Sequence, residues 1–164
     1  MRTKTLITWN INGIRARQDH LQRWLAQHKP DMLCLQETKI DDEKFPVEAI
    51  AKEGYFAAFA GQKAYNGVAI LSREPPEEVR IGFAGDNREE QKRLIAATID
   101  GVRVVNAYVP NGQALDSPKY PEKLDFLTRL RKYFERHHNP RETLVLVGDF
   151  NIAPDDIEEA INGQ

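Results

Sequence analysis

The sequence predicts an α/β fold in which a mixed β-sheet is covered by helices on its outside. Two passages, over residues 6–36 and 102–147, alternate strand, helix and strand, which favours parallel pairing. Between them lies a series of short β-type runs, which favours antiparallel hairpins. The chain has 164 residues, 41% of them hydrophobic, without repeats or linker-like stretches. One domain over residues 1–164 with a sizeable core is therefore expected.

The first passage opens on an apolar run at residues 6–9, which predicts a strand. Apolar residues then recur near helical spacing from Ile14 to His28, which predicts an amphipathic helix. Proline disfavours helical backbone at the residue before it, so the helix should stop before Pro30. A second, buried strand is predicted over residues 31–36.

The middle of the chain carries β-type runs at residues 55–60, 67–72, 94–99 and 102–109. Asp100-Gly101, between the last two runs, is a strong signal for a two-residue hairpin turn. A second long helix is predicted around the apolar residues of 124–134, ending near Pro140. An apolar run at residues 143–147 predicts the last strand, which leads into the stretch 148–151.

Composition excludes several classes of protein. The net charge of −2 argues against holding nucleic acid by bulk attraction alone. No apolar run approaches the roughly 18 residues of a membrane span, and the first residues carry no signal-like segment. The single cysteine, Cys34, lies in an apolar run and is expected to be a buried structural thiol. A cytoplasmic location without membrane contact is the expectation.

Polar side chains gather where the predicted strands end. Carboxylate and amide oxygens are hard ligands, and Mg²⁺ or Mn²⁺ is the natural ion for a site with few carboxylates. The four histidines lie on or beside predicted helices without zinc-like spacing, so zinc is not favoured. The residues at strand ends are Asn10, Asn12, Glu37, Tyr108, Asn111, Asp149 and Asn151.

Each of these residues also has an ordinary structural interpretation. The stretch 10–13 is typical of a turn, because Asn and Gly tolerate left-handed backbone. Glu37 could pair with Lys39, Asp149 could cap a turn, and Tyr108 could be a strand aromatic. Taken singly, none of them requires a functional role.

Taken together, the stretches form a more specific pattern. Seven of them follow one another through the whole chain: WNINGIR (9–15), QETK (36–39), GQK (61–63), GVAIL (67–71), RLIA (93–96), NAYVPNG (106–112) and GDFN (148–151). In this order and spacing they resemble the motifs of the exonuclease III family of the endonuclease/exonuclease/phosphatase superfamily. That resemblance implies a four-layer α/β sandwich with mixed sheets, of which this chain is the N-terminal part.

The resemblance also implies roles for individual residues. Glu37 matches the principal metal carboxylate, with Asn10 in the same shell, and Asp149 and Asn151 complete the expected metal set. Tyr108, Asp149 and Asn151 match the catalytic residues: the phenol contacts the scissile phosphate, the aspartate activates water and the amide holds the phosphate. Contacts to DNA are expected from Asn12, Arg15, Lys39, Arg93 and Asn111.

The implied activity is metal-dependent hydrolysis of phosphodiesters in DNA repair, with Mg²⁺ or Mn²⁺ as cofactor. The substrate would be double-stranded DNA with abasic sites or 3′ ends, and the complete enzyme is expected to be monomeric. Family members continue into a further aspartate and a Ser-Asp-His motif that residues 1–164 do not contain, so these residues alone are expected to be inactive. Two alternatives stay open: a non-catalytic DNA-binding remnant, and a superfamily phosphodiesterase acting on a small or lipid substrate.

Overall fold

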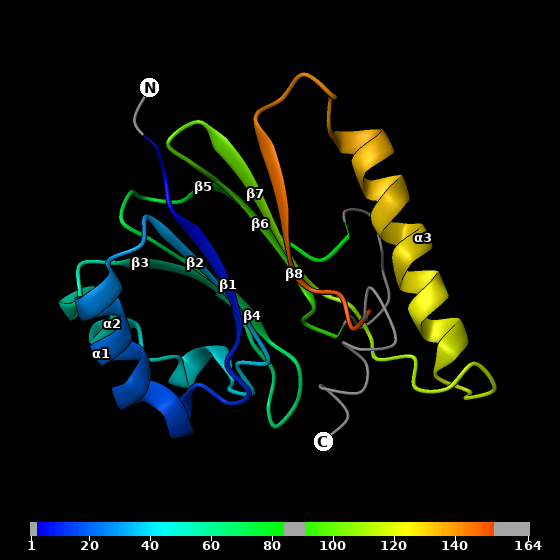
Figure 1. Ribbon diagram of the computed structural model, residues 1–164, viewed down its shortest axis with the longest axis horizontal. Helices are drawn as coiled ribbons and strands as arrows, with labels where there is room; N and C mark the ends of the chain where they lie inside the picture. Colours follow the sequence, from blue (N-terminus) through cyan, green and yellow to red (C-terminus); the bar gives the residue numbers. More distant parts are fainter. Residues whose placement is uncertain (1–2, 84–90, 153–164) are drawn as a thin grey trace.

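The computed structural model describes residues 3–83 and 91–152, which form two four-stranded sheets packed face to face (Figure 1). The strand order is β1-β2-β4-β3 in the first sheet and β5-β6-β7-β8 in the second. The strands are β1 (Leu6–Asn10), β2 (Met32–Gln36), β3 (Phe56–Ala60), β4 (Val68–Ser72), β5 (Glu77–Ile81), β6 (Leu94–Ile99), β7 (Val102–Tyr108) and β8 (Leu144–Asp149).

Helices cover the outer face of each sheet. They are α1 (Gln18–His28), α2 (Val47–Lys52) and α3 (Tyr120–His137), and two short 3-10 helices span Arg15–Arg17 and Asp42–Lys44. In Figure 1, α1 and α2 lie beside the first sheet and α3 lies beside the second. The predicted four-layer α/β sandwich is therefore confirmed. None of the helices in the described ranges is long and apolar enough to cross a membrane.

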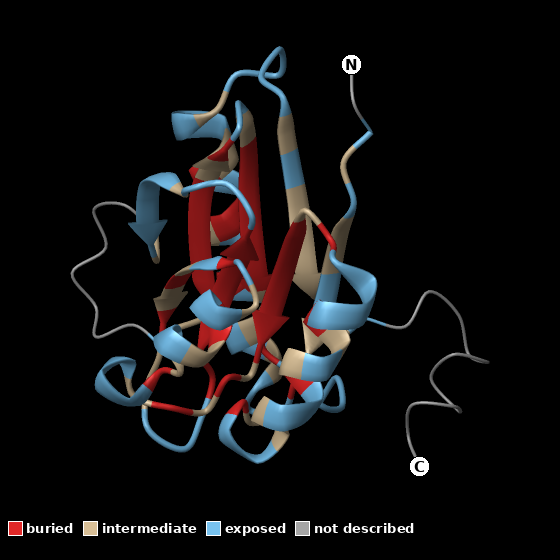
Figure 2. Cartoon of the chain, turned by 90° about the vertical axis from the view of Figure 1, so that its left-hand side faces the viewer, coloured by how far each residue is buried: buried red, intermediate tan, exposed pale blue. Residues whose placement is uncertain are grey.

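Three apolar layers join the four layers of secondary structure. Leu21 and Leu25 of α1 pack with Leu33 and Leu35 on the outer face of the first sheet. Phe126, Leu130 and Tyr133 of α3 pack on the outer face of the second sheet. Alternate residues of the strands fill the space between the sheets, because successive side chains point to opposite faces. Figure 2 shows these buried strands at the centre and exposed loops around them.

Cys34 belongs to the layer between the sheets and is fully buried, as predicted. Burial raises the pKa of its thiol to about 12, because the thiolate would lose its hydration. The side chain therefore acts as a small apolar core residue.

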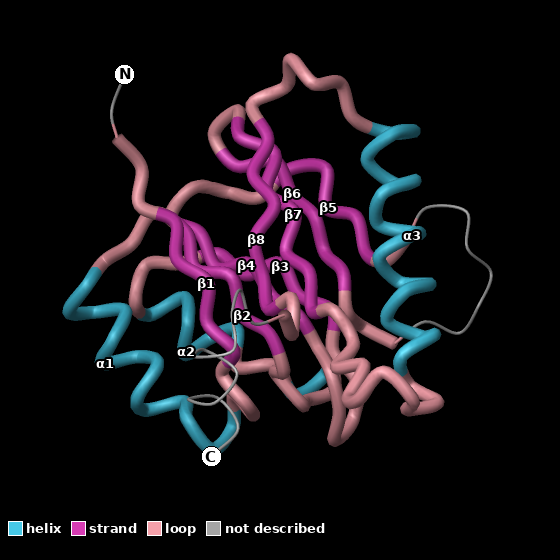
Figure 3. Tube along the Cα trace, turned by 45° about the vertical axis from the view of Figure 1, so that its right-hand side comes forward, coloured by secondary structure: helices cyan, strands magenta, loops and turns pink. Residues whose placement is uncertain are grey.

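Each sheet is mixed, as the sequence predicts. Strands β1 and β2 are parallel, as are β7 and β8, whereas the other neighbouring pairs are antiparallel. The Asp100-Gly101 turn joins β6 to β7, and both of its residues have positive φ. Because two parallel strands end at the same edge of a sheet, the carboxyl ends of β1, β2, β7 and β8 meet at one end of the sandwich (Figure 3).

The structure differs from the sequence prediction in two short elements and one boundary. Strand β5 is missed because all its residues are exposed, so it shows no apolar alternation. Helix α2 is missed because its six residues are too few to show a helical period. The first helix begins at Gln18 rather than near Ile14, after the 3-10 turn Arg15–Arg17.

The last strand is found where predicted. Within the described residues β8 lies at the edge of the second sheet, and Val145 is 37% exposed. An apolar sequence run by itself does not distinguish an edge strand from a central one.

Gly148 gives a test of how β8 is held. A Cβ at this position would lie 1.8 Å from the Ala107 oxygen, and its φ of +145° also disfavours other residues. We expect Gly148→Ala to lower the free energy of unfolding by about 3 kcal/mol, because backbone must shift to relieve the clash. Gly101→Ala is the matched control: its φ is +76° but no atom lies near, so we expect only about 1 kcal/mol. Urea unfolding measures both, and equal losses would contradict the close approach.

Candidate active site

The polar residues predicted at the strand ends do meet at one end of the sandwich. Asn10 ends β1, Glu37 follows β2, Tyr108 ends β7 and Asp149 ends β8. Each sheet thus supplies two of the four side chains. The sequence placed them only at separate strand ends, and the packing of the two sheets brings them into contact.

One amide links the two carboxylates across the sheets. The side-chain NH₂ of Asn10 donates to Glu37 Oε1 at 2.8 Å and to Asp149 Oδ2 at 2.8 Å. Its oxygen accepts the backbone N–H of Asn12 at 3.1 Å. Asn10 therefore holds the two carboxylates together through its NH₂ group, while its side-chain oxygen faces the backbone of Asn12.

Glu37 is the most densely contacted of these residues. Its Oε1 also accepts the Tyr108 hydroxyl at 2.8 Å, and its Oε2 lies 2.8 Å from the Lys39 ammonium. Burial by itself would raise the pKa of Glu37, but the hydrogen bonds from Asn10, Lys39 and Tyr108 outweigh it and lower the pKa below its ordinary value. The site therefore holds an ionised carboxylate at neutral pH.

The backbone at Glu37 is held in a conformation that such residues seldom adopt. Its φ is +55°, in the left-handed region, where a residue with a Cβ is strained. Backbone hydrogen bonds hold the loop on both sides: Gly13 donates to the oxygen of Glu37 at 2.7 Å, and Thr38 donates to the oxygen of Gly67 at 3.2 Å. The surrounding loops thus fix the direction of the Glu37 side chain.

Asp149 and Asn151 form a turn at the end of β8. The backbone N–H of Asn151 donates to Asp149 Oδ1 at 3.0 Å, and the Asn151 side-chain NH₂ donates to the Val109 oxygen at 2.8 Å. Lys123 of α3 donates to the backbone oxygen of Asn151. This contact was not predicted, because a lysine on an amphipathic helix is ordinarily a solvated residue.

The residues predicted to contact DNA differ in how close they lie to the carboxylates. Lys39 donates to Asn12 Oδ1 as well as to Glu37, so both residues lie at the site. Arg15 is exposed on the neighbouring 3-10 helix. Asn111 is exposed too, and its side-chain oxygen accepts the Gln113 N–H, so it shapes its own turn.

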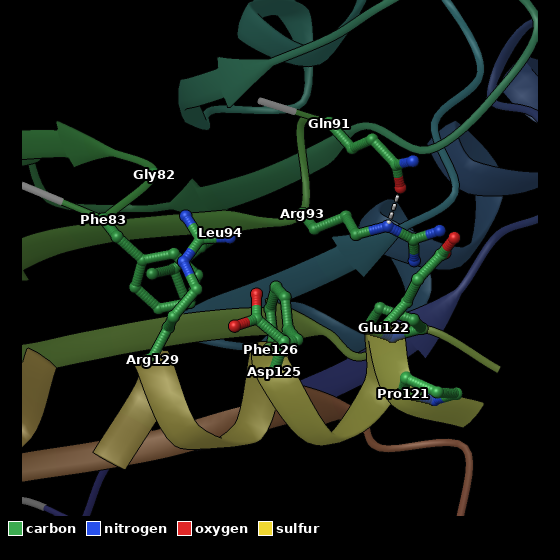
Figure 4. A pocket seen from close by; sticks show the side chains of 11 residues that line it. Gly82, Phe83, Gln91, Arg93, Leu94, Pro121, Glu122, Asp125, Phe126 and Arg129 are labelled. Carbon is green, nitrogen blue, oxygen red and sulfur yellow. Dashed lines mark hydrogen bonds between the residues drawn. The ribbon is translucent and has the colours of Figure 1, made fainter. Parts of the chain in front are cut away.

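Arg93 stacks on the ring of Tyr108. Its guanidinium lies 4.5 Å from the ring centroid and donates to the Tyr108 backbone oxygen at 3.3 Å. Gln91 accepts a hydrogen bond from Arg93 Nε (Figure 4). A cavity of about 390 Å³ opens beside Arg93, between β6 and α3, rather than at the carboxylates.

The environment of Tyr108 gives a pH-dependent prediction. Burial, followed by the hydrogen bond to Glu37, raises the pKa of Tyr108 from 10.0 to about 12. Because the folded-state value is the higher one, this contribution to stability is full below pH 10 and is lost as the pH rises towards 12. We expect Tyr108 to remain protonated at pH 10 when its ¹³Cζ signal is followed by NMR. Tyr108→Phe identifies the signal, and half-ionisation at pH 10 would contradict the contact with Glu37.

The donor set fits a hard divalent cation. Glu37 and Asp149 supply carboxylate oxygens, and they are held within hydrogen-bond distance of one amide group. No group of three or more His, Cys, Asp or Glu residues with metal-site geometry occurs within residues 3–83 and 91–152. A site with few carboxylates, whose remaining ligands would be water, suits Mg²⁺ or Mn²⁺ better than zinc.

Each sheet of the sandwich brings a carboxylate to a common rim, an arrangement suited to a metal-dependent hydrolase. Residues 7–158 match the model of the endonuclease/exonuclease/phosphatase family, and the chain belongs to that family. The family includes metal-dependent nucleases. The resemblance recognised in the motifs is therefore confirmed.

Individual relatives agree with this assignment. The chain is 37% identical to exodeoxyribonuclease III of Haemophilus influenzae, over 96% of this chain and 61% of the relative. Among solved structures it is similar to an AP endonuclease from Archaeoglobus fulgidus, with a TM-score of 0.89 and 43% identity, covering 94% of this chain and 60% of that one. It is also similar to the 3′ phosphatase NExo from Neisseria bound to a product DNA hairpin, with a TM-score of 0.88, 44% identity and coverage of 94% and 60%. The chain thus spans about 60% of the length of these relatives.

Proposed function

We propose that the full-length protein is a Mg²⁺- or Mn²⁺-dependent phosphodiesterase that acts on DNA. Its substrates are duplex DNA with abasic sites and DNA 3′ ends, and it acts as a monomer. The observation that carries the proposal is the contact of Asn10 with both Glu37 and Asp149, which gathers two carboxylates from different sheets at one rim. The similarity to an AP endonuclease and to a DNA 3′ phosphatase supports DNA as the substrate.

The residues of the site suit attack on a phosphodiester. Glu37 and Asp149 would hold the cation, which supplies positive charge to a phosphate that gains negative charge as its bond breaks. Asp149 accepts the proton of the attacking water, a task for which a carboxylate within hydrogen-bond reach is suited. The Tyr108 hydroxyl and the Asn151 amide are fixed polar groups that stabilise charge on the phosphate oxygens.

Basic side chains around the rim would hold the DNA backbone. Arg15 is exposed beside the site, and Lys39 and Arg93 border Glu37 and Tyr108. Such contacts to phosphate position the duplex without reading its sequence. Each contributes to affinity in a way that weakens as salt rises.

The direct test is an incision assay with the full-length protein. A labelled duplex with one abasic site, an intact duplex and a duplex with a 3′ phosphate are incubated with Mg²⁺, Mn²⁺ or EDTA. We expect cleavage at the abasic site and release of the 3′ phosphate with either metal and neither product in EDTA. Binding without cleavage would favour the non-catalytic remnant. Turnover of a small or lipid phosphodiester alone would favour the alternative substrate.

A further inference from the structure

A pair of buried amides joins the two sheets directly beneath the candidate site. Gln36, the last residue of β2, is 1% exposed, and Asn106 of β7 is fully buried. The Gln36 side-chain NH₂ donates to Asn106 Oδ1 at 2.7 Å and to the Thr8 hydroxyl of β1 at 2.9 Å. Both amides belong to stretches of the motif pattern, Gln36 to residues 36–39 and Asn106 to residues 106–112, but the sequence had given neither of them a role.

Asn106 adds two further links between the sheets. Its side-chain NH₂ donates to the backbone oxygens of Leu35 in β2 and Ala69 in β4, both at 2.9 Å. Two strands of the first sheet, β2 and β4, are thereby joined to β7 of the second sheet. Burying an amide costs free energy unless its hydrogen bonds are made, so this network favours one relative placement of the sheets over others.

The pair lies next to the hydrogen bond between Tyr108 and Glu37 at the candidate site. Gln36 directly precedes Glu37, and Asn106 is two residues before Tyr108 on the same face of β7. The hydrogen bond from Tyr108 to Glu37 joins the end of β7 to the residue that follows β2, directly beside the bond from Gln36 to Asn106. A change in the spacing of β2 and β7 would therefore alter both contacts.

We propose that Gln36 and Asn106 are positioning residues, which set the spacing between Glu37 and Tyr108 through hydrogen bonds between the sheets. This inference rests on the proposed function, because its consequence is measured on catalysis. An apolar pair of similar size would serve stability as well, since replacing both partners of a buried hydrogen bond is often neutral. Hydrogen bonds depend on the angle between donor and acceptor, so the network sets the orientation of the two strands relative to each other. Apolar packing has no such dependence on direction.

The test compares three variants of the full-length protein. Asn106→Leu removes every link made by Asn106, and Gln36→Met removes one amide at nearly constant volume. Val104→Ala is the matched control: Val104 lies on the same face of β7, fully buried between the sheets, and its side chain has no polar atom that could hydrogen-bond to either amide. Urea unfolding, kcat and KM for abasic duplex are measured for each. The signal of 3-fluorotyrosine placed at position 108 is followed by ¹⁹F NMR in the same variants.

We expect Asn106→Leu to lower kcat roughly 10- to 100-fold, because a displacement of about 1 Å in a reacting group has that effect. Gln36→Met should have a smaller effect of the same kind, KM should stay within about twofold of wild type, and the ¹⁹F signal should move in both amide variants. Val104→Ala should lose stability while keeping kcat and the ¹⁹F signal. Equal kcat and ¹⁹F signals in all variants, or effects confined to KM, would overturn the proposal. If wild type itself does not cut DNA, the proposed function fails, and the ¹⁹F signal still decides whether the pair positions Tyr108.

Discussion

Glu37→Gln is expected to lower metal-dependent cleavage by roughly a thousandfold in the full-length protein, because the charge stabilisation from a bound cation is worth several kcal/mol. The carboxylate accepts hydrogen bonds from Asn10 and Tyr108 and pairs with Lys39. A glutamine has one acceptor oxygen and one NH₂ group, so it would place a donor against at least one of these donors. The initial rate of incision and the binding of Mn²⁺, followed by water proton relaxation, should both fall.

Glu48→Gln is the control for Glu37, because it removes the same charge from an exposed position on α2. It should leave the rate and the Mn²⁺ affinity unchanged. Urea unfolding of both variants separates loss of fold from loss of metal. Wild-type rate and Mn²⁺ affinity in Glu37→Gln would remove Glu37 from the metal site.

Asp149→Asn is expected to reduce kcat by about 10²- to 10⁴-fold, the usual contribution of a positioned general base. Asn keeps an oxygen that can accept the Asn151 N–H or the Asn10 amide, so the turn at the end of β8 should be retained. Binding of abasic duplex, measured by fluorescence anisotropy in Ca²⁺, should therefore stay close to wild type.

The control for Asp149 is Asp19→Asn, which changes an exposed acid in the first turn of α1. Its turnover and DNA affinity should match wild type. If Asp149→Asn loses DNA binding and turnover together, the residue maintains the fold of the site and does not act as the base.

Most of the fold follows from patterns within single segments. The strands β1, β2, β3, β4, β6, β7 and β8 are apolar enough to be recognised, and α1 and α3 have a clear helical period. These patterns are local, since the burial of a face imposes a period of 2 on strands and 3.6 on helices. Strand β5 is exposed and helix α2 is short, so neither buries enough apolar surface to produce a recognisable hydrophobic period in the sequence.

The fold class, the motifs at the strand ends and the chemistry of their side chains could all be predicted from the amino-acid sequence. Which of these side chains meet depends on the packing of the two sheets, since Asn10 and Asp149 are 139 residues apart and lie in different sheets. The tertiary structure also revealed the pairing of Gln36 with Asn106. Contacts of this kind depend on how two sheets pack, and no periodicity within one strand carries that information.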